Sequence, residues 1–374
     1  MHINTLLKMA LDRGASDVHL KTGSHPWIRV DGTLIPITEV KRLTGEDTAK
    51  IAFSIMTEPQ KEYFQANRDI DFSYSVSGLG RFRVNSFYQR GTVGIVLRII
   101  SFDIRTVREL NLPSILENIA MAQRGLVLVT GTTGSGKSTT LASMIDYINT
   151  HRIDHIITIE DPIEYVHRDK RSIINQRELE TDTSSFSIAL RAALRADPDV
   201  VLVGEMRDLD TIETALIAAE TGHLVLSTLH TVDATETINR IISIFPPFQQ
   251  KQIRIQLATV LKSVISQRLM KTADGKGRVP AVEILIATKY IQECIENKDK
   301  TGMIRDAIAA GTSQYGMQTF DQSLFYLFRQ GMITEEEAMR GATNPADLKL
   351  KLQGIESASD VARKQMESEI FGDE

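Results

Sequence analysis

The stretch from Gly131 to Ser138, Gly-Thr-Thr-Gly-Ser-Gly-Lys-Ser, strongly constrains the folds that this chain can adopt. It fits the pattern G-x-x-x-x-G-K-[ST], in which glycines let the backbone curl so that its N–H groups point at phosphate oxygens. The apolar run 125–130 precedes the motif, and a helical pattern follows it. A strand, a phosphate-binding loop and a helix in this order predict an α/β domain that binds a nucleotide.

The chemistry of this loop gives its residues separate roles. We expect the side chain of Lys137 to reach the β- and γ-phosphates and the hydroxyl of Ser138 to bind Mg²⁺. ATP and Mg²⁺ are therefore the expected cofactors. The residues assigned to nucleotide binding in the loop are Gly131, Thr132, Thr133, Gly134, Ser135, Gly136, Lys137, Ser138 and Thr139.

Short apolar runs separated by helical patterns continue after Pro113 and predict a parallel sheet covered on both faces. We expect helices at 139–150 and 211–221. From about residue 245 the pattern predicts a largely helical chain, with one helical segment over 246–269 and a hairpin at 271–285. The strands of the sheet are expected within 125–131, 155–161, 200–205 and 223–230.

The first hundred residues have a different pattern, which predicts a small α/β domain. An opening helix is followed by strands and turns over 16–37. A helical stretch is expected around 44–65, where Thr44 and Asp47 form a capping box. Alternation of apolar and polar residues then predicts an antiparallel meander whose strands lie within 69–76, 80–90 and 92–100.

Bulk composition narrows the class of protein. A chain of 374 residues is expected to form two domains, and 42% hydrophobic with 24% charged residues is typical of a globular protein. The formal net charge of −5 argues against a protein that coats DNA or RNA. Cys294 has no second cysteine to pair with, which fits a reducing compartment. No apolar run reaches the roughly 20 residues that span a bilayer, so we expect a cytoplasmic protein.

Acidic residues follow two of the apolar runs. The stretch ITIEDPIEYV places Glu160, Asp161 and Glu164 around a proline, where they form either a hydrophilic turn or part of a reaction site. The run 200–203 is followed by Glu205. In a sheet that carries a phosphate-binding loop, an acid at this position typically binds Mg²⁺ or its waters. Most such strands end in Asp, so Glu205 departs from the common form.

Four stretches, GTTGSGKSTT, ITIEDPIE, LRADPDVVLVGEMRD and TGHLVLSTLHT, resemble the Walker A, Asp box, Walker B and His box of secretion and type IV pilus motor ATPases. Their order and spacing match, and SDVHLKTGSHPWIRVDG and RFRVNSFYQR extend the resemblance over nearly the whole chain. Within this superfamily the chain most resembles the pilus retraction (twitching motility) ATPases. The resemblance implies a PAS-like N-terminal α/β domain and a RecA-like P-loop NTPase domain with a helical C-terminal portion, assembled into hexameric rings.

The resemblance also implies domain bounds and site residues. The PAS-like domain would span 1–100, a linker 101–112 and the RecA-like ATPase domain 113–355, with a flexible acidic tail over 356–374. Glu164 would be the catalytic glutamate that polarises the attacking water, and Glu205 the Walker B acid at Mg²⁺. Lys137 and His230 would act in catalysis, and His223 would contribute to nucleotide binding. The arginines that reach the γ-phosphate would come from Arg81, Arg83, Arg98 and Arg105.

Plain structural alternatives exist for the histidines and arginines. His223 and His230 are seven residues apart, which is not a usual spacing for zinc ligands, and a lone strand histidine is often structural. The alternation of Arg with Phe and Tyr in RFRVNSFYQR is found in proteins that bind single-stranded nucleic acid. In a meander, the same alternation places core residues on one face and solvated residues on the other.

Two features of the sequence indicate which subtype of motor ATPase the chain resembles and where it departs from that subtype. Pilus extension and type II secretion ATPases commonly carry a four-cysteine zinc insertion, which a single cysteine excludes. In the retraction family the segment after AVEILIAT usually reads AIRNLIRE. Here it reads YIQECIEN at 290–297, with Gln292 and Glu296 at the arginine positions. The expected amphipathic helix keeps its apolar positions but reverses its exposed charge.

We therefore expect a hexameric ATPase motor that drives type IV pilus retraction. The implied partners are further copies of the chain, an inner-membrane pilus platform protein and a paralogous ATPase, with no nucleic acid and with membrane contact only through partners. The expected location is the cytoplasm, at the inner face of the cell membrane. The alternatives are a pilus extension or type II secretion ATPase, a DNA-translocating RecA-like ring, a protein that binds ATP without hydrolysing it, and a small-molecule kinase.

Overall fold

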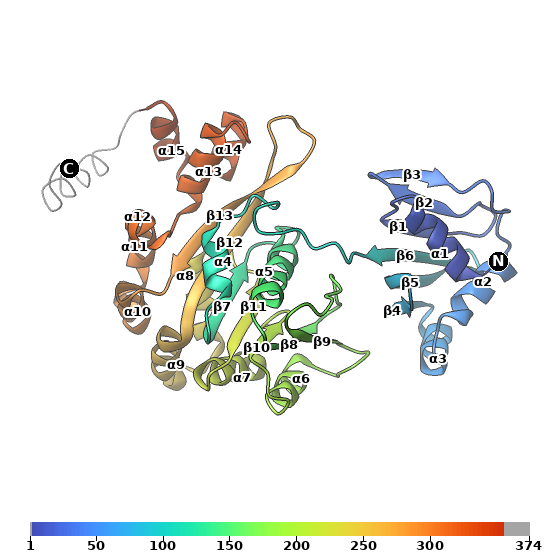
Figure 1. Cartoon of the computed structure of the whole chain (residues 1–374), viewed down its shortest axis with the longest axis horizontal. Helices are drawn as coiled ribbons and strands as arrows, with labels where there is room; N and C mark the ends of the chain where they lie inside the picture. Colours follow the sequence, from blue (N-terminus) through green and yellow to red (C-terminus); the bar gives the residue numbers. More distant parts are fainter. Residues whose placement is uncertain (1, 355–374) are drawn as a thin grey trace, which may run out of the picture. The chain divides into compact units, whose positions relative to one another are not determined.

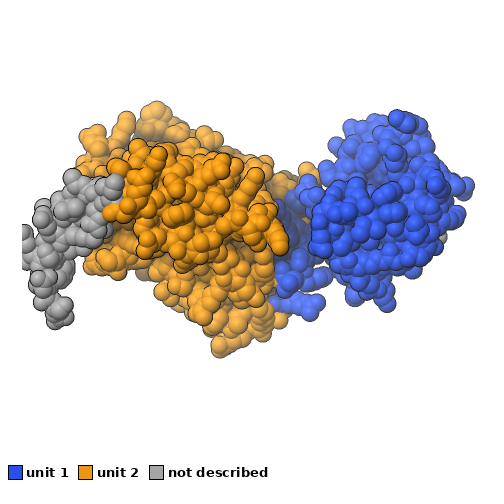
Figure 2. Space-filling view, turned by 90° about the horizontal axis from the view of Figure 1, so that it is seen from above, with its two compact units in different colours: residues 1–103, 162–168 blue, residues 104–161, 169–374 orange. Residues whose placement is uncertain are grey.

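The computed structural model describes residues 2–354, and it divides the chain into two compact units (Figure 2). Unit 1 comprises residues 1–103 together with 162–168, and unit 2 comprises 104–161 together with the chain from 169 onward. The chain therefore passes from unit 1 into unit 2, returns for seven residues, and enters unit 2 again. The tail expected at 356–374 lies outside the described residues.

Unit 1 is a six-stranded antiparallel sheet with helices α1, α2 and α3, in the strand order β3-β2-β1-β6-β5-β4 (Figure 1). The strands β4, β5 and β6 form the antiparallel meander that the alternation predicts. The elements are α1 (Ile3–Asp12), β1 (Asp17–Leu20), β2 (Trp27–Val30), β3 (Thr33–Pro36), α2 (Gly45–Ser54), α3 (Glu58–Asn67), β4 (Asp69–Val76), β5 (Gly80–Gln89) and β6 (Thr92–Ile100).

The helical stretch expected over 44–65 is two helices, α2 and α3. The predicted capping box of α2 is present, because Thr44 Oγ1 accepts the Asp47 N–H while the Asp47 carboxylate accepts the Thr44 N–H. A second helix start follows at Thr57, whose N–H donates to Gln60 Oε1 at 2.9 Å. The reason for the error is local. The sequence Thr-Glu-Pro-Gln is itself a capping signal with proline in the first turn, and it interrupts the helical pattern.

Unit 2 is built on a seven-stranded sheet with the order β13-β12-β7-β11-β10-β8-β9. All neighbouring pairs are parallel except β12 with β13. The strands are β7 (Gly125–Thr130), β8 (His155–Glu160), β9 (Ile173–Glu178), β10 (Val200–Val203), β11 (Leu224–Leu229), β12 (Leu261–Lys271) and β13 (Arg278–Ile286).

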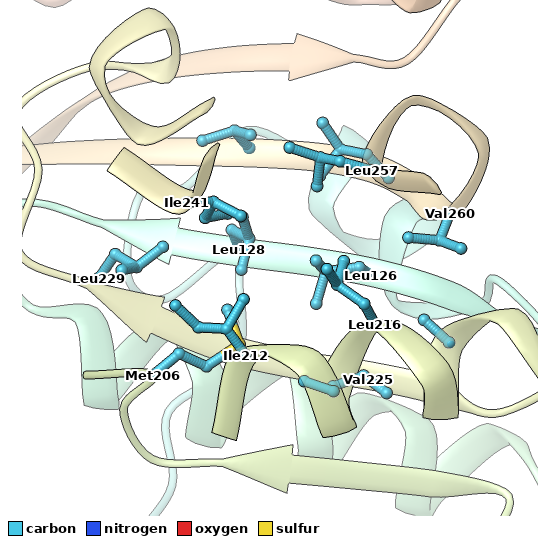
Figure 3. Packing of buried hydrophobic residues seen from close by; sticks show 14 of the residues in the cluster. Leu126, Leu128, Met206, Ile212, Leu216, Val225, Leu229, Ile241, Leu257 and Val260 are labelled. Carbon is cyan, nitrogen blue, oxygen red and sulfur yellow. The ribbon is translucent and has the colours of Figure 1, made fainter. Parts of the chain in front are cut away.

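Helices cover both faces of this sheet (Figure 1). Along β7, Val127 and Val129 point into one core with α4 and α5. Leu126 and Leu128 point into the other core, where Figure 3 shows them in one cluster with Leu216 of α7. The helices are α4 (Ile115–Ala120), α5 (Lys137–His151), α6 (Phe186–Ala193), α7 (Leu209–Glu220), α8 (Ala234–Ile244), α9 (Pro247–Val260), α10 (Lys289–Glu296), η1 (Lys298–Met303), α11 (Ile304–Ala310), α12 (Thr312–Tyr315), α13 (Phe320–Arg329), α14 (Glu335–Gly341) and α15 (Pro345–Leu352).

The helix expected over 246–269 ends at Val260, and the residues that follow form β12 instead. This strand pairs in parallel with β7 and is buried along most of its length. A strand apolar on both faces and a buried helix give similar short apolar runs, so periodicity does not separate them. The predicted hairpin is present, because β12 and β13 pair in antiparallel register from Lys271 with Arg278 onward.

The segment expected as a linker lies partly within unit 2. Of the segment expected as a linker at 101–112, residues from Ile104 belong to unit 2, and Val107 and Leu112 are buried in its core. This part of the segment is therefore core rather than connector.

Among the helices of the described chain, none is long and apolar enough to cross a membrane.

Candidate active site

The phosphate-binding loop lies between β7, which is buried throughout, and α5, which begins at Lys137. Gly131, Gly134 and Gly136 have φ values of 143°, 78° and 94°, a region that residues with a Cβ rarely adopt. A Cβ at Gly131 would meet Gln267 O at 2.5 Å and Ser135 Oγ at 2.5 Å. The loop thus needs glycine at this position both for its backbone angle and for space.

Polar groups inside the loop fit a bound phosphate. The Lys137 Nζ is buried and donates to the carbonyl oxygens of Gly131 at 2.8 Å and Thr132 at 3.1 Å, which holds the ammonium within the curl of the loop. The Ser135 Oγ is buried and has no hydrogen-bond partner among the described residues. Ser138 is half-buried in the first turn of α5. An unsatisfied hydroxyl beside a buried ammonium is the donor set that a phosphate group satisfies.

Glu205 lies at the same edge of the sheet as this loop. The strands β7, β8, β10 and β11 are parallel, so their carboxyl ends meet at one edge. The backbone just after β10 is held from both sides, since the Gly204 N–H donates to Ile159 O at 2.7 Å and Thr228 Oγ1 donates to Gly204 O at 2.7 Å. The position of Glu205 is therefore fixed by the neighbouring strands.

Two cationic or potentially cationic groups contact the Glu205 carboxylate. Its Oε2 lies 2.8 Å from Arg207 Nη2 and 3.2 Å from His230 Nε2. Burial by itself raises the pKa of Glu205, but the interactions with Arg207 and His230 outweigh burial and bring the pKa below its ordinary value. Glu205 is therefore ionised at neutral pH, as an acid that binds Mg²⁺ or its waters must be.

The three acids of ITIEDPIEYV separate in the structure. Glu160 ends β8 and its Oε1 accepts hydrogen bonds from Thr158 Oγ1 at 2.6 Å and Gln176 Nε2 at 3.1 Å, so β9 holds it. Asp161 follows in an exposed turn. Glu164 is exposed and belongs to the segment 162–168 of unit 1. Unit 2 therefore brings together Glu160, Glu205 and the phosphate-binding loop, and Glu164 belongs to the other unit.

The histidines lie at opposite edges of the sheet in unit 2. His230 directly follows β11 at the edge that carries the loop. His223 directly precedes β11, where its Nδ1 is 2.9 Å from Ala218 O, and its carbonyl accepts the Gly125 N–H at the start of β7. Six-residue strands place these edges about 16 Å apart. Within one chain, His223 therefore lies away from the phosphate-binding loop, because a strand carries its two ends to opposite edges. Its expected role in nucleotide binding stays a prediction.

Three of the four candidate arginines share one face of the sheet in unit 1. Arg81 and Arg83 alternate on β5 with the buried Phe82, and Arg83 lies opposite Arg98 on β6. The Arg98 Nε forms an ion pair with the buried Asp17 at 3.0 Å. Burial raises the pKa of Asp17, but the hydrogen bonds from Ser16 and Arg98 lower it by more, so the pKa lies below its ordinary value. The carboxylate is therefore ionised and holds Arg98 in place.

The remaining candidates differ in their surroundings. The Arg81 Nη1 donates to Ser75 Oγ at 3.2 Å on the neighbouring strand. Arg83 is exposed, and Arg105 is exposed in unit 2. The structure thus gives Arg98 a structural partner within its own unit, while its side chain is exposed like those of Arg83 and Arg105.

Sequence reasoning missed Arg207 and Gln176, which contact Glu205 and Glu160. Arg207 lies within the quoted stretch GEMRD, two residues after Glu205, so its proximity could have been expected. Gln176 lies on β9, a strand that the pattern did not predict, and no local signal links it to Glu160.

Comparisons with known proteins place the chain in a family. A family model described as "Type II/IV secretion system protein" matches residues 1–340. The type IV pilus retraction ATPase PilT of Pseudomonas aeruginosa is 47% identical over 345 residues, covering 92% of this chain and 99% of that protein. The type IV pilus ATPase PilU of the same organism is 42% identical over 361 residues, covering 96% of this chain and 94% of that protein.

A solved structure supports the same assignment. The crystal structure of the pilus retraction motor PilT with bound ADP has a TM-score of 0.84 and 49% sequence identity, and the match covers 93% of this chain and 99% of that chain. This confirms the expected fold class of an N-terminal α/β domain followed by a RecA-like ATPase domain, and it confirms that the chain is a nucleotide-binding ATPase. The chain belongs to the type II/IV secretion system protein family and, within it, to the type IV pilus ATPases.

Proposed function

We propose that this chain is the ATP-hydrolysing subunit of a motor that retracts type IV pili. The observation that carries the proposal is the arrangement at one sheet edge of unit 2. A loop shaped for phosphate holds the buried Lys137 there, and the ionised Glu205 follows β10 at the same edge. The relatives named for pilus retraction and twitching motility support the cellular role, because the chain matches them over most of its length.

The chemistry would be in-line attack of water on the γ-phosphate, a reaction governed by positioning and charge neutralisation. Lys137 and the loop amides would bind the phosphates, and Ser138 would hold Mg²⁺ together with the phosphate oxygens. Glu205 would bind Mg²⁺ or its waters. Within the described residues no group of three or more carboxylate, histidine or cysteine side chains could hold a metal ion. Phosphate oxygens and waters would complete the ligands of Mg²⁺.

Glu164 would polarise the attacking water, and arginines from unit 1 would approach the γ-phosphate from the same or a neighbouring subunit. Arg81, Arg83 and Arg98 are the candidates in unit 1, since they share one face of its sheet. Contact between His230 and Glu205 would link the His box to the metal site. His223 would contribute only where the neighbouring subunit brings it to a nucleotide.

The working assembly would be a homohexameric ring in the cytoplasm at the inner face of the cell membrane. An inner-membrane platform protein of the pilus would receive the motion, and domain closure around ATP would supply it. The likeness to a solved structure of a retraction motor supports such an assembly.

A second candidate is a retraction ATPase that works together with a paralogue. Two observations favour it. Pseudomonas aeruginosa has two type IV pilus ATPases, PilU and PilT, which align over 96% and 92% of this chain, so two such relatives occur in one organism. In α10, Gln292 and Glu296 stand where the retraction family usually has arginines, so the exposed face has a different charge.

The proposal is tested by replacing Glu164 with glutamine. The amide keeps the shape of the side chain but no longer attracts a proton, so the E164Q variant should bind ATP as the unmodified chain does and lose about 10²- to 10⁴-fold in turnover. Phosphate release and binding of a fluorescent ATP analogue measure the two effects. The matched control is E213Q, which changes an exposed acid on α7. Near-normal turnover in E164Q would refute the catalytic role.

In cells, deletion of the gene should leave surface pili that no longer retract, with loss of twitching. Complementation with E213Q should restore twitching and complementation with E164Q should not. Bald cells after deletion would instead identify an extension ATPase. Pili that stop retracting only when a second ATPase gene is also deleted would support the paralogue candidate.

A further inference from the structure

Glu283 is a buried acid outside the site described above. It lies on β13 with only 5% of its surface exposed. In register, Glu283 lies opposite Ser266 of β12, and Ser266 lies opposite Thr130, the last residue of β7 before the phosphate-binding loop. The carboxylate is therefore level with the edge of the sheet at which the nucleotide residues gather.

The carboxylate of Glu283 contacts the start of α8. Its Oε1 accepts the Ala234 N–H at 2.9 Å, and Ala234 is the first residue of that helix. A carboxylate is favoured there because the first N–H groups of a helix have no partner within the helix and carry partial positive charge. The bond joins residues that are 49 positions apart in the sequence, so it ties α8 to a distant strand.

The residues 230–233, here called the His loop, connect β11 to α8. The His loop is closed onto its own helix, because the Val232 N–H donates to Glu236 Oε2 at 2.9 Å and the Thr231 and Thr237 hydroxyls are 2.6 Å apart. Its first residue, His230, lies 3.2 Å from Glu205. The start of the His loop thus touches the metal-site acid, and its end is anchored by Glu283.

Charged groups around Glu283 do not neutralise it. Among the described residues it forms no ion pair, although Asp233 at the end of the His loop, Arg268 of β12 and Arg305 of α11 act on it. The Arg268 guanidinium lies 3.9 Å over the ring of Phe320 and donates to Gly341 O at 2.7 Å. Arg305 pairs with Asp321 of α13 at 3.2 Å. The Ala234 N–H is therefore the direct partner of the Glu283 carboxylate.

We propose that Glu283 is a positioning residue for ATP hydrolysis, which fixes the end of the His loop so that His230 stays against Glu205. The proposal rests on the hydrolytic function proposed above and names a residue that sets its geometry. A loop anchored at α8 on one side and at β11 on the other has little freedom to carry His230 away from the carboxylate. Without the anchor, the distance between His230 and Glu205 varies and turnover falls.

The anchor depends on pH. Burial, aided by Asp233, raises the pKa of Glu283 to about 7, against the opposing effects of the Ala234 N–H and the arginines. The ionised form is the stronger acceptor, so the anchor is strongest above about pH 7 and weakens as the pH falls through this value. The effect on stability has the opposite sign. The pKa of Glu283 is higher in the folded state than in the unfolded state. Its contribution to the free energy of unfolding is therefore largest below the ordinary pKa of a glutamate and falls as the pH rises from there through about 7.

A rise in pH strengthens the anchor but lowers the contribution of Glu283 to stability. Measurements of turnover and of unfolding can therefore tell a role in positioning His230 from a role in stability alone. The E283Q variant keeps the shape and an acceptor oxygen but removes the charge. At pH 8 its kcat should fall about tenfold, which corresponds to about 1.4 kcal/mol in the barrier, with KM for ATP unchanged within about twofold. Its midpoint of thermal unfolding at pH 8 should be equal to or above that of the unmodified chain. The ratio of the two kcat values should approach one below pH 6.

The matched control is E337Q. Glu337 is also a buried acid that accepts a backbone N–H, from Lys271 at 2.7 Å, but it lies on α14 and does not contact the His loop. Its loss should leave the kcat ratio close to one at every pH. A double-mutant cycle with H230A adds a direct measure of coupling, because the E283Q effect should largely disappear when His230 is absent.

Three results would count against the proposal. An unchanged kcat in E283Q, a kcat loss that is the same at all pH values, or a loss that multiplies fully with that of H230A would overturn the positioning role. If the unmodified chain releases no phosphate from ATP, the proposed hydrolytic function fails as well. An active chain with an unaffected E283Q variant would reject only the role of Glu283.

Discussion

At the scale of single residues, Gly131 shows how a position in the motif is fixed by its surroundings as well as by its backbone angle. Its φ of 143° excludes most side chains, and the oxygens of Gln267 and Ser135 occupy the space that a Cβ would need. The motif predicts a glycine here for the curl of the loop. The contact with β12 adds a second reason, which depends on a neighbouring strand.

The G131A variant should therefore lose both stability and nucleotide binding. We expect a fall of about 1–3 kcal/mol in the free energy of unfolding, because the methyl group forces Gln267 or Ser135 to move. ATP affinity should fall by at least about tenfold, because the N–H groups of the loop would no longer point at the phosphate oxygens. Urea unfolding and titration with a fluorescent ATP analogue measure these effects. The control is G302A, where nothing lies within 4 Å of the added Cβ, and both quantities should stay near their original values.

At the scale of elements, α10 shows an amphipathic helix in which the sequence pattern was correct. Ile291, Cys294 and Ile295 are buried and join the core between α9, α11 and the sheet, as their spacing predicts. Gln292 is half-buried and Glu296 is exposed on the outer part of the helix. The departure from the usual charge of the retraction family therefore changes the surface of this element and leaves its core side intact.

The burial of α10 predicts slow chemistry at Cys294. Burial raises the pKa of its thiol, against smaller effects of Tyr290 and Lys300, and the side chain is fully covered. Since the thiolate is the reactive form, N-ethylmaleimide should label the native protein at least about tenfold more slowly than the urea-unfolded chain. The single cysteine makes the mass shift unambiguous. Equal rates in both states would show that α10 opens freely from the core.

At the scale of the whole molecule, the path of the chain links the two units through the segment that carries Glu164. This segment, 162–168, belongs to unit 1, although β8 immediately before it belongs to unit 2. Within unit 1 the Val166 N–H donates to Ser101 O at 3.3 Å, and the Arg168 guanidinium lies 5.2 Å over the Phe102 ring. The proposed catalytic glutamate is thus carried by the unit that also contains Arg81 and Arg83.

Weakening this attachment should lower turnover without affecting ATP binding. In the R168A variant the loss of stacking on Phe102 removes about 0.5–1 kcal/mol, so amide hydrogen exchange over 163–167 should become about two- to fivefold faster. The kcat should fall by a similar factor because Glu164 is held less firmly. The control is R171A, an exposed arginine whose Nη1 donates to His151 O at 3.4 Å within unit 2. Exchange rates that do not change in R168A would contradict the role of this contact.

The sequence by itself determined the features that depend on neighbours close along the chain. The phosphate-binding loop, the capping box at Thr44, the meander β4-β5-β6 and the amphipathic helix α10 follow from local spacing and backbone preferences. The fold class and the ATPase activity follow from motifs of this kind together with their order, and the comparisons confirm both. Local interactions were sufficient here because the residue types needed are specific to each structure.

Only the tertiary structure decided which of these residues meet. β12 is a strand because it pairs with β7 in the sheet. No hydrophobic periodicity within its own residues indicates this pairing. His223 and His230 lie at opposite edges because β11 runs across the sheet between them. Arg98 is held by Asp17, 81 residues away, and Glu283 reaches Ala234 across 49 residues. Burial and pairing over such separations depend on how the layers assemble, and a pattern read along the chain has no access to that.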